Sequence, residues 1–311
     1  MKGKIAVLAG GLSPEREVSL LSGHRVRNAL LERGWDAVTI DPAESPLLES
    51  LAAGNFDACY IALHGKEGED GTVQRLLELV GLPYTGTRPF RCQIAFDKAL
   101  AKEALATAGV PTPPWAVIQA SALRDLSAGH ILRQVVDRVG LPVAVKPAQA
   151  GSAMGLSFVE REAELPAAIM GALSFSDACI VERRILGTEV TAGLVGNPPE
   201  ALPLVEIVPK SGTYDYGSRY TAGATEYFAP ARLDPGVSQM AHSVALQAFT
   251  SLHLKDVGRA DIIVDQEGDP WVLEVNVSPG MTEMSLLPMA AQAAGLSLAD
   301  LCERVLELAL A

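Results

Sequence analysis

The chain has 311 residues, 49% of them hydrophobic and 20% charged, which is typical of a globular protein of about two domains. Its formal net charge of −12 argues against a nucleic-acid partner, because a polyphosphate backbone requires a basic face, but it still allows a small anionic substrate. The four cysteines are widely spaced, which favours buried reduced thiols over structural zinc. The apolar run at residues 5–8 is too short for a secretion signal or a membrane span, so we expect a cytoplasmic protein without membrane contact.

The first 80 residues alternate between short apolar runs and helical patterns. We expect strands at residues 4–8, 37–40 and 58–63, and helices at about 18–31, 46–53 and 72–80. This alternation predicts a parallel sheet with right-handed crossovers, on which ligands bind beyond the carboxyl ends of the strands. Two glycine-bearing turns at such ends carry Glu15 and His64. Plain helix capping around Glu15 and a satisfied structural histidine are the alternatives.

The middle of the chain is less regular. One helix is expected at about 92–108, and the prolines at 111, 113 and 114 mark a domain boundary after it. Further strands are expected at 115–119, 143–145, 156–159 and 179–182, and further helices at about 126–139, 162–173, 237–251 and 297–309. Residues 209–223 are rich in glycine and tyrosine and are expected to form a long loop, which in a compact domain is usually functional or disordered.

The most informative stretch is WVLEVNVSPGM at residues 271–281. Glu274 and Asn276 are two apart, so on a strand both side chains point to one face, and their oxygens suit a hard cation such as Mg²⁺. Arg259 and Asp261 have the same spacing at the start of another apolar run. Two neighbouring strands of this kind place a cation and a guanidinium over one small volume, as phosphoryl transfer from a nucleotide requires. One such pair alone fits the wet face of a β-hairpin, but two pairs favour a site.

Lys146 follows the apolar run 143–145 and precedes a loop of small residues at 148–155. Small residues let the backbone approach phosphates, and a strand-end lysine supplies a point charge, although an ordinary hairpin connection fits the same pattern. Lys98 lies on the helix before the prolines, where a solvated lysine is the alternative. The strand at 179–182 leads toward Glu189 through a linker of the kind that binds adenine, and a surface strand edge also fits it.

Motifs along nearly the whole chain resemble those of D-alanine–D-alanine ligase, an ATP-grasp enzyme of peptidoglycan synthesis. The matching motifs are GG-x-S-x-EREVS (10–19), ALHG-x-x-GEDG (62–71), LPYTG (82–86), DK (97–98), VKP…GS…G (145–155), VE…E (181–189), SGTYDY…RY (211–220), GRAD (258–261) and LEVN-x-SPGMT-x-x-SL-x-P (273–288). The resemblance implies an α/β chain, in part α+β, with an ATP-grasp fold preceded by a Rossmann-like parallel-sheet N-terminal domain. We expect an N-terminal parallel α/β substrate domain at 1–93, a central ATP-grasp subdomain with the phosphate loop at 94–178, and a C-terminal ATP-grasp subdomain with the metal and oxyanion site at 179–311.

The activity implied by the resemblance is the ATP-dependent ligation of two D-alanines to D-alanyl-D-alanine, through a D-alanyl phosphate, for peptidoglycan precursor synthesis. The resemblance also implies two Mg²⁺, which Mn²⁺ can replace, and a homodimer. Two alternatives stay open: a sister ligase whose second substrate is D-lactate, D-serine or another amino acid, and an inactive nucleotide-binding homologue. A tyrosine such as Tyr220 in the closing loop accompanies D-alanine in the family and favours the dipeptide. The intact metal and oxyanion residues argue against loss of catalysis.

The resemblance assigns roles to individual residues. For ATP, the phosphates would contact Lys98, Lys146 and Ser152, and adenine and ribose would contact Glu182, Ile185 and Glu189. The metal ligands would be Asp261, Glu274 and Asn276. Glu15 would bind the ammonium group of the first D-alanine, and His64 and Arg219 would also lie in the substrate site. Arg259 and the N–H of Gly280 would bind the oxyanion. Ser285 and Leu286 would bind the carboxylate of the second D-alanine. Tyr220 would link to Ser152 and Glu15 and close the site.

The chain departs from the family pattern at a few positions. Ala150 and Ala153 stand where the family often has Glu and Ser, the pair Arg183 and Arg184 replaces a Lys-aromatic pair, and Val277 replaces a common Thr. Arg219 stands where the family usually has Lys. Because the metal and oxyanion residues are intact, we expect the reaction class to be kept. The departures cluster around the phosphate loop and the nucleotide edge, so they bear on ATP affinity.

Overall fold

The computed structural model describes residues 2–125 and 128–311. Its first sheet is parallel and has the strand order β2-β1-β3, formed by β1 (Lys4–Leu8), β2 (Asp36–Ile40) and β3 (Ala58–Ile61). The helices that follow these strands are α1 (Arg16–Glu32), α2 (Leu47–Gly54) and α3 (Thr72–Val80). Ile5 and Val7 pack on the α1 side of the sheet, whereas Ala6 and Leu8 pack on the other side with residues of α2 and α3. The predicted alternation of strands and helices is confirmed.

The expectation of one helix at 92–108 is wrong. The chain forms two helices there, α4 (Pro89–Phe96) and α5 (Lys98–Thr107). Between them Asp97 is extended (φ −84°, ψ 104°), and its carboxylate accepts hydrogen bonds from the N–H groups of Ala99 and Leu100. An aspartate N-cap satisfies donors that a new helix leaves free, so the chain can bend at this point. As a result α5 packs against β13 (Pro270–Asn276), with Lys98 as its first residue.

The second sheet is antiparallel and has the order β4-β7-β5-β6, formed by β4 (Trp115–Gln119), β5 (Val143–Pro147), β6 (Ser157–Val159) and β7 (Ala178–Arg183). Its helices are α6 (Ala120–Asp125), α7 (Ala128–Val139), the 3₁₀ helix η1 (Glu162–Glu164) and α8 (Leu165–Leu173). The helix expected at 126–139 is present from residue 128, and residues 126 and 127 lie outside the described part of the chain. Because β7 pairs with β4 and β5, we propose to end the central subdomain after Arg183, which keeps this sheet in one segment.

The third sheet has the order β11-β10-β8-β12-β13, with β9 paired to β8. Its other strands are β8 (Gly187–Gly196), β9 (Pro199–Ala201), β10 (Val205–Pro209), β11 (Thr225–Phe228) and β12 (Val257–Asp265). Its helices are α10 (Pro235–Ser251), which packs against β12 and β13, and α11 (Leu286–Ala293), which packs against β8. The predicted strands at β12 and β13 are confirmed, whereas β8 to β11 and α11 were not among the expected elements. The long loop at 209–223 contains one short helix, α9 (Tyr216–Tyr220).

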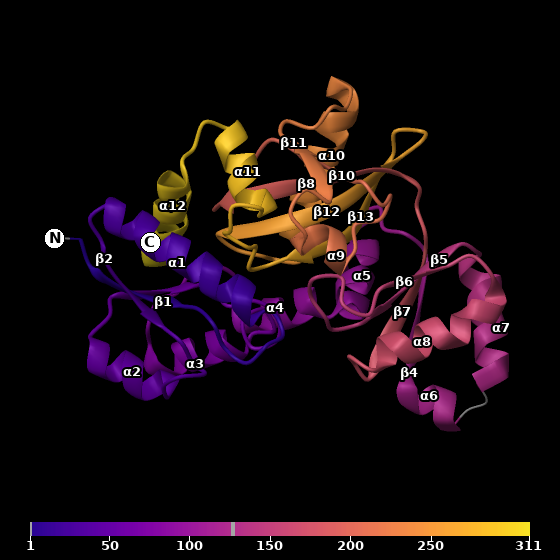
Figure 1. Cartoon of the computed structure of the whole chain (residues 1–311), viewed down its shortest axis with the longest axis horizontal. Coiled ribbons are helices and arrows are strands. Elements are labelled where there is room, and N and C mark those ends of the chain that lie inside the picture. Colours follow the sequence, from indigo (N-terminus) through magenta and orange to yellow (C-terminus); the bar gives the residue numbers. More distant parts are fainter. Residues whose placement is uncertain (1, 126–127) are drawn as a thin grey trace.

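The last helix, α12 (Leu298–Leu310), returns to the first sheet and packs against α1 and β3. Figure 1 shows the consequence: the indigo N-terminal elements and yellow α12 form one end of the molecule, the third sheet lies in the middle, and the second sheet with α7 and α8 forms the other end. Within the described residues, no helix is both long and apolar enough to cross a membrane.

Candidate active site

Two adjoining cavities lie where the three sheets meet. The larger has a volume of about 580 Å³ and the smaller about 190 Å³. Lys98, Arg219 and Glu274 line both of them, so they mark the junction. Of the other residues assigned from the resemblance, the larger cavity is lined by Glu15, His64, Ser152, Tyr220, Arg259, Asn276, Gly280, Ser285 and Leu286, and the smaller by Lys146, Glu182, Ile185, Glu189 and Asp261. The structure therefore gathers the whole set around one pair of cavities.

The antiparallel pairing of β12 and β13 places the two charged pairs opposite each other. Arg259 is registered with Asn276, and Asp261 with Glu274. Nε and Nη2 of Arg259 each donate a hydrogen bond of 2.7 Å to the Asp261 carboxylate, and Thr191 Oγ1 donates another of 2.7 Å. Burial lowers the pKa of Arg259, but the carboxylates of Asp261 and Glu274 outweigh burial and raise it above its ordinary range. The guanidinium is thus charged and fixed at the cavity wall.

The oxygens of Asp261, Glu274 and Asn276 form a donor set that fits a hard divalent cation. Among the described residues, no three His, Cys, Asp or Glu side chains gather closely enough to hold a metal alone. The set therefore offers two carboxylates and an amide oxygen, and substrate phosphate oxygens complete the coordination in sites of this kind. Burial raises the pKa of Glu274, but Lys98, Lys146 and Arg219 outweigh it and hold the pKa well below its usual range, so this carboxylate is ionised.

The small-residue loop after β5 is tied to the start of α5. Lys98 Nζ donates a hydrogen bond of 2.6 Å to the carbonyl oxygen of Ala150 and lies 3.3 Å from Glu274 Oε2. Ser152 and Ala153 have left-handed backbone conformations, with φ of 50° and 56°. Successive residues in such conformations turn backbone N–H groups toward one side, which suits an anion. Lys98 thus joins the predicted phosphate loop to a predicted metal ligand.

The carboxylate of Glu182 lies between two lysines. Lys146 Nζ is 2.6 Å from Glu182 Oε1, and Lys102 Nζ is 2.8 Å from Glu182 Oε2. Burial raises the pKa of Glu182, but the two ammonium groups outweigh it and lower the pKa, so the carboxylate is ionised. Its side chain is 3% exposed and is occupied by these ion pairs. Contact between Glu182 and adenine therefore has to come from the Glu182 backbone or from the part of the carboxylate that the two lysines leave accessible.

Ile185 and Glu189 line the smaller cavity, Ile185 after β7 and Glu189 on β8. Glu189 pairs across the sheet with Ile207 on one side and Ile263 on the other, so its carboxylate is close to apolar strands. The pKa of Glu189 is raised to about 7, chiefly by burial; Arg219 and Arg259 oppose the rise, and the carboxylates of Asp261 and Glu274 add to it. Glu189 is thus a carboxylate that titrates near neutral pH.

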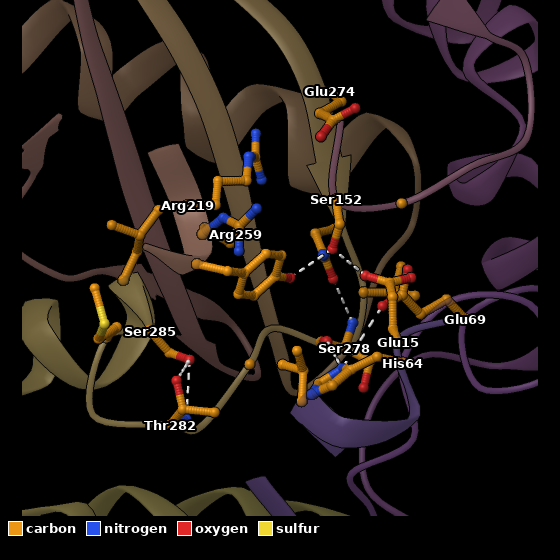
Figure 2. A pocket seen from close by; sticks show the side chains of 18 of the residues that line it. Glu15, His64, Glu69, Ser152, Arg219, Arg259, Glu274, Ser278, Thr282 and Ser285 are labelled. Carbon is orange, nitrogen blue, oxygen red and sulfur yellow. Dashed lines mark hydrogen bonds and ion pairs between the residues drawn. The ribbon is translucent and has the colours of Figure 1, made fainter. Parts of the chain in front are cut away.

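Three side chains from distant segments form a hydrogen-bonded chain across the larger cavity (Figure 2). Ser152 Oγ donates to Glu15 Oε1, and Tyr220 OH lies 2.6 Å from Ser152 Oγ. The other carboxylate oxygen, Glu15 Oε2, is buried without a hydrogen-bond partner among residues 2–125 and 128–311. A Cβ on Gly151 would lie 2.5 Å from that oxygen, so a larger residue would displace it. An unpaired buried carboxylate oxygen is an acceptor prepared for a ligand.

Arg219 lies beside this chain on the short helix α9. Its guanidinium carbon is 4.4 Å from the centre of the Tyr214 ring, a cation–π contact within the loop at 209–223. Its Nε is buried and has no hydrogen-bond partner in the part of the chain that the structure describes. The stacked guanidinium therefore has a donor left over at the junction of the two cavities.

His64 connects the N-terminal sheet with the turn after β13. Its Nε2 lies 3.0 Å from Ser22 Oγ, and its Nδ1 lies 3.1 Å from the carbonyl oxygen of Ser278. Glu69 Oε1 is 3.7 Å from Nδ1. Both ring nitrogens thus have partners inside the protein, which favours a positioning role for this histidine over direct contact with a substrate.

The turn at 277–285 forms the floor of the larger cavity. The N–H of Ser278 donates a hydrogen bond of 2.8 Å to Asn276 Oδ1, and the N–H of Met281 donates one of 3.1 Å to Ser22 Oγ. Ser285 is the N-cap residue of α11, so Leu286 is the first residue of that helix. The first N–H groups of a helix have no partner within it and carry partial positive charge, which favours a carboxylate at this point.

Comparison with known proteins agrees with this geometry. The family model described as D-ala D-ala ligase C-terminus matches residues 104–307, and the one described as D-ala D-ala ligase N-terminus matches residues 44–87. The D-alanine--D-alanine ligase of Pelotomaculum thermopropionicum is 42% identical over 99% of this chain and 96% of its own. This chain belongs to the D-alanine–D-alanine ligase family.

Solved structures of this family and of a sister ligase have the same fold. The D-alanine--D-alanine ligase from Bacillus anthracis complexed with ATP is 29% identical, with a TM-score of 0.84 over 99% of this chain and 97% of the other. VanG D-Ala:D-Ser ligase from Enterococcus faecalis is 26% identical, with a TM-score of 0.85 over 99% and 100%. The predicted ATP-grasp fold with its N-terminal parallel-sheet domain is confirmed, and the fold alone does not separate the two ligase types.

The sequence of this D-alanine–D-alanine ligase family member did not single out four polar residues that support the site. They are Ser22, Glu69, Lys102 and Thr191, and each contacts an assigned residue. Lys102 had one visible signal, because it lies one helical turn after Lys98 on the same face of α5. The other three pair with residues that are 5 to 70 positions away, so no local pattern announces them.

Proposed function

We propose that this chain uses ATP to ligate two D-alanines to D-alanyl-D-alanine, the reaction for which its relatives are named, in the synthesis of peptidoglycan precursors. One observation carries the proposal: a cavity with charges suited to a nucleotide adjoins a cavity with an unpaired carboxylate oxygen and a helix N-terminus. Lys98, Arg219 and Glu274 lie at the junction, where a phosphoryl group has to pass from one substrate to the other.

ATP occupies the smaller cavity in this proposal. Lys98 and Lys146 contact its phosphates, and the linker with Ile185 and the carboxylate of Glu189 hold adenine and ribose. Two Mg²⁺, or Mn²⁺ in their place, are held by Asp261, Glu274 and Asn276 and supply charge neutralisation for the phosphates when bound. Without the nucleotide, Lys98 and Arg259 contact Glu274 and Asp261, so these cations keep the two carboxylates in place.

The first D-alanine binds by its ammonium to Glu15, whose free Oε2 is the available acceptor. Its carboxylate oxygen attacks the γ-phosphorus of ATP, the bond between that phosphorus and the ADP oxygen breaks, and D-alanyl phosphate forms. The like charges of the two reactants repel each other, so Lys98 and Arg219 at the junction lower the barrier by lying beside the transferred group.

The second D-alanine binds by its carboxylate to Ser285 and to the N–H of Leu286 at the start of α11. Once its ammonium has lost a proton, the amine attacks the acyl carbon. The C–N bond forms, the acyl C–O bond to phosphate breaks, and the second proton of the nitrogen leaves with the departing phosphate. Nε and one N–H of Nη2 of Arg259 donate to Asp261, so the N–H groups of Nη1 and the second N–H of Nη2 can donate to the oxyanion, together with the N–H of Gly280. Asp261 thereby fixes the guanidinium in the orientation that the second step needs.

An acyl phosphate hydrolyses readily, so water has to be kept out during the reaction. The loop at 209–223 lies over the larger cavity and is fastened there by the contact between Tyr220 and Ser152. This contact, together with the family preference for tyrosine with D-alanine, favours D-alanine over D-lactate or D-serine as the second substrate. We also propose a cytoplasmic homodimer without nucleic-acid or membrane partners, in keeping with a net charge of −12.

The test is a substrate panel. The protein is mixed with ATP, Mg²⁺ and D-alanine, alone or with D-lactate or D-serine, and ADP release and the ligated product are measured together. We expect D-alanyl-D-alanine as the main product, with one ADP released for each dipeptide. A mixed product formed in preference to the dipeptide would support the sister ligase instead, and binding of ATP without ADP release would support an inactive homologue.

A further inference from the structure

Lys102 is an unusual residue in the middle of α5. It is 1% exposed and is among the largest fully buried side chains of the described chain. Its neighbours on the same helix, Ala101 and Leu105, pack in an apolar core, so a hydrophobic residue would suit this position for packing alone. Burying an ammonium group costs free energy unless it is well paired. The presence of lysine here therefore calls for a reason beyond packing.

The Lys102 ammonium is held by three partners. Its Nζ lies 2.6 Å from Thr112 Oγ1, 2.8 Å from Glu182 Oε2 and 5.5 Å from the centre of the Trp115 ring. The hydroxyl of Thr112 in turn donates a hydrogen bond of 2.8 Å to the carbonyl oxygen of Val272 on β13. These contacts connect α5 with β7 and β13. Lys102 does not line either cavity, whereas its partner Glu182 lines the smaller one.

The important consequence concerns the other side of Glu182. Its second oxygen, Oε1, lies 2.6 Å from the Nζ of Lys146, the lysine assigned to the ATP phosphates. A pair made of Glu182 and Lys146 alone would be neutral, and a nucleotide phosphate would gain little from a lysine whose charge is already balanced. With Lys102 on the far oxygen, the two lysines and Glu182 together keep one net positive charge, and this charge faces the carboxylates of Glu274 and Asp261, which also act on Lys146.

We propose that Lys102 is a positioning residue for nucleotide binding: it balances the charge of Glu182 and anchors that carboxylate, so that Lys146 is held in place with its charge available to the ATP phosphates. The inference rests on the proposed function, because it takes Lys146 as a phosphate contact. Lys102 itself touches no substrate in this scheme.

The experiment compares ATP binding, the KM for ATP, the KM for D-alanine, kcat and Tm for four proteins. The first variant is Lys102→Met, which keeps the length of the side chain and removes the charge. We expect ATP binding to weaken about tenfold, the size of one charge-assisted hydrogen bond, and the KM for ATP to rise accordingly, while the KM for D-alanine changes less than about twofold. The matched control is Leu105→Ala on the same helix, which lowers Tm without altering any charge and should leave ATP affinity unchanged.

The decisive protein is the double variant Lys102→Met with Glu182→Gln. It removes one positive and one negative charge, so Lys146 again carries a free positive charge. We expect it to bind ATP more tightly than Lys102→Met alone, although it has lost two native groups. A merely structural Lys102 predicts the reverse, because two losses in one buried cluster would add. If Lys102→Met does not fold, Lys102→Gln replaces it, since glutamine also removes the charge and keeps a polar group beside Glu182 and Thr112.

Two results would overturn the inference. One is ATP affinity in Lys102→Met within twofold of the unaltered protein, and the other is a double variant that binds ATP no better than Lys102→Met. Failure of the proposed function is a separate outcome: the unaltered protein would then bind ATP without turning over D-alanine, whereas the effect of Lys102 on ATP affinity would still be measurable.

Discussion

The β12–β13 pair and the loop at 209–223 both line the larger cavity, but they are held in different ways. On β12, Asp261 is 5% exposed and is bound by Arg259 and Thr191, with Glu274 opposite on β13. In the loop, Tyr220 is 41% exposed and reaches the rest of the site through one hydroxyl contact to Ser152. The groups that handle charge are thus fixed before substrates arrive. In the loop, Tyr214 is buried and contacts Tyr227, but the Tyr220 end meets the rest of the site through that one hydroxyl. Catalysis and closure should therefore respond separately to mutation.

Among the changes in the β12–β13 pair, Glu274→Gln should lower turnover the most. It removes one carboxylate from the predicted cation site and the partner of Lys98, so we expect turnover to fall by on the order of 10³ or more with the fold intact. ADP release and Tm are measured on the same preparation. Glu226→Gln, an exposed carboxylate on β11, is the control and should be normal. Near-normal ADP release by Glu274→Gln would show that the cation site is elsewhere.

Arg259→Ala tests the oxyanion assignment within the same region. Because the guanidinium acts on charge that develops during the reaction, its loss should lower kcat by about 10²–10³, or roughly 3–4 kcal/mol, and change ATP affinity much less. Arg259→Lys keeps the positive charge but loses the bidentate contact with Asp261, so its kcat should lie between that of Arg259→Ala and that of the unaltered protein. An unstable variant whose folded fraction is normally active would mean that Arg259 only pairs with Asp261.

Glu189 should give the site a pH dependence. Its pKa is raised to about 7, so the carboxyl is protonated below that pH and ionised above it. A ribose hydroxyl donates to the ionised form more strongly, and at pH 6 only about a tenth of the group is ionised, so ATP affinity should fall up to about tenfold between pH 8 and pH 6. Calorimetric titration of the protein with ATP at several pH values between 6 and 8 measures this change in affinity. Glu189→Gln should remove the dependence, and its persistence in that variant would assign it to another group.

The smallest effect is expected in the loop. Apart from the buried Tyr214, residues 209–223 bury little apolar area, so proteolysis there should slow when ATP and D-alanine are added. Tyr220→Phe removes the hydroxyl that contacts Ser152 and should raise the cleavage rate of the free protein about threefold, in keeping with one hydrogen bond. Tyr216→Phe, an exposed tyrosine one helical turn away, is the control. Equal cleavage with and without ligands would show that the loop is not a lid.

The sequence predicts those parts of the molecule whose pattern is local. The parallel N-terminal sheet and the β12–β13 pair have short apolar runs with a clear period, and both are confirmed. The bend at Asp97 was missed because the residues on both sides favour helix, so only the capping side chain marks the break. β8 to β11 were missed because segments with interspersed glycine, threonine and proline have a weak period, and pairing with β12 is what fixes them as strands.

The site shows the same division. The resemblance gave every assigned residue a place, and the structure brings them around two adjoining cavities, but their roles stay predictions. Sequence patterns could not predict the polar residues that hold these site residues in position. Lys102 meets Glu182 across 80 positions of chain, and Ser22 meets His64 across 42. Such contacts depend on how the sheets pack against each other; the spacing of Lys102 from Lys98 suggests a shared helix face but does not identify Glu182 as its partner.

The central claim is that the phosphoryl group of ATP passes to a carboxylate of D-alanine before the peptide bond forms. It is tested most directly with D-alanine labelled with ¹⁸O in both carboxylate oxygens, mixed with the protein, ATP and Mg²⁺. Mass spectrometry of the products should find one ¹⁸O in the inorganic phosphate for each dipeptide formed, and one ¹⁸O missing from the dipeptide. Dipeptide formed with unlabelled phosphate would contradict the claim, because no bond between a D-alanine oxygen and phosphorus would then have formed.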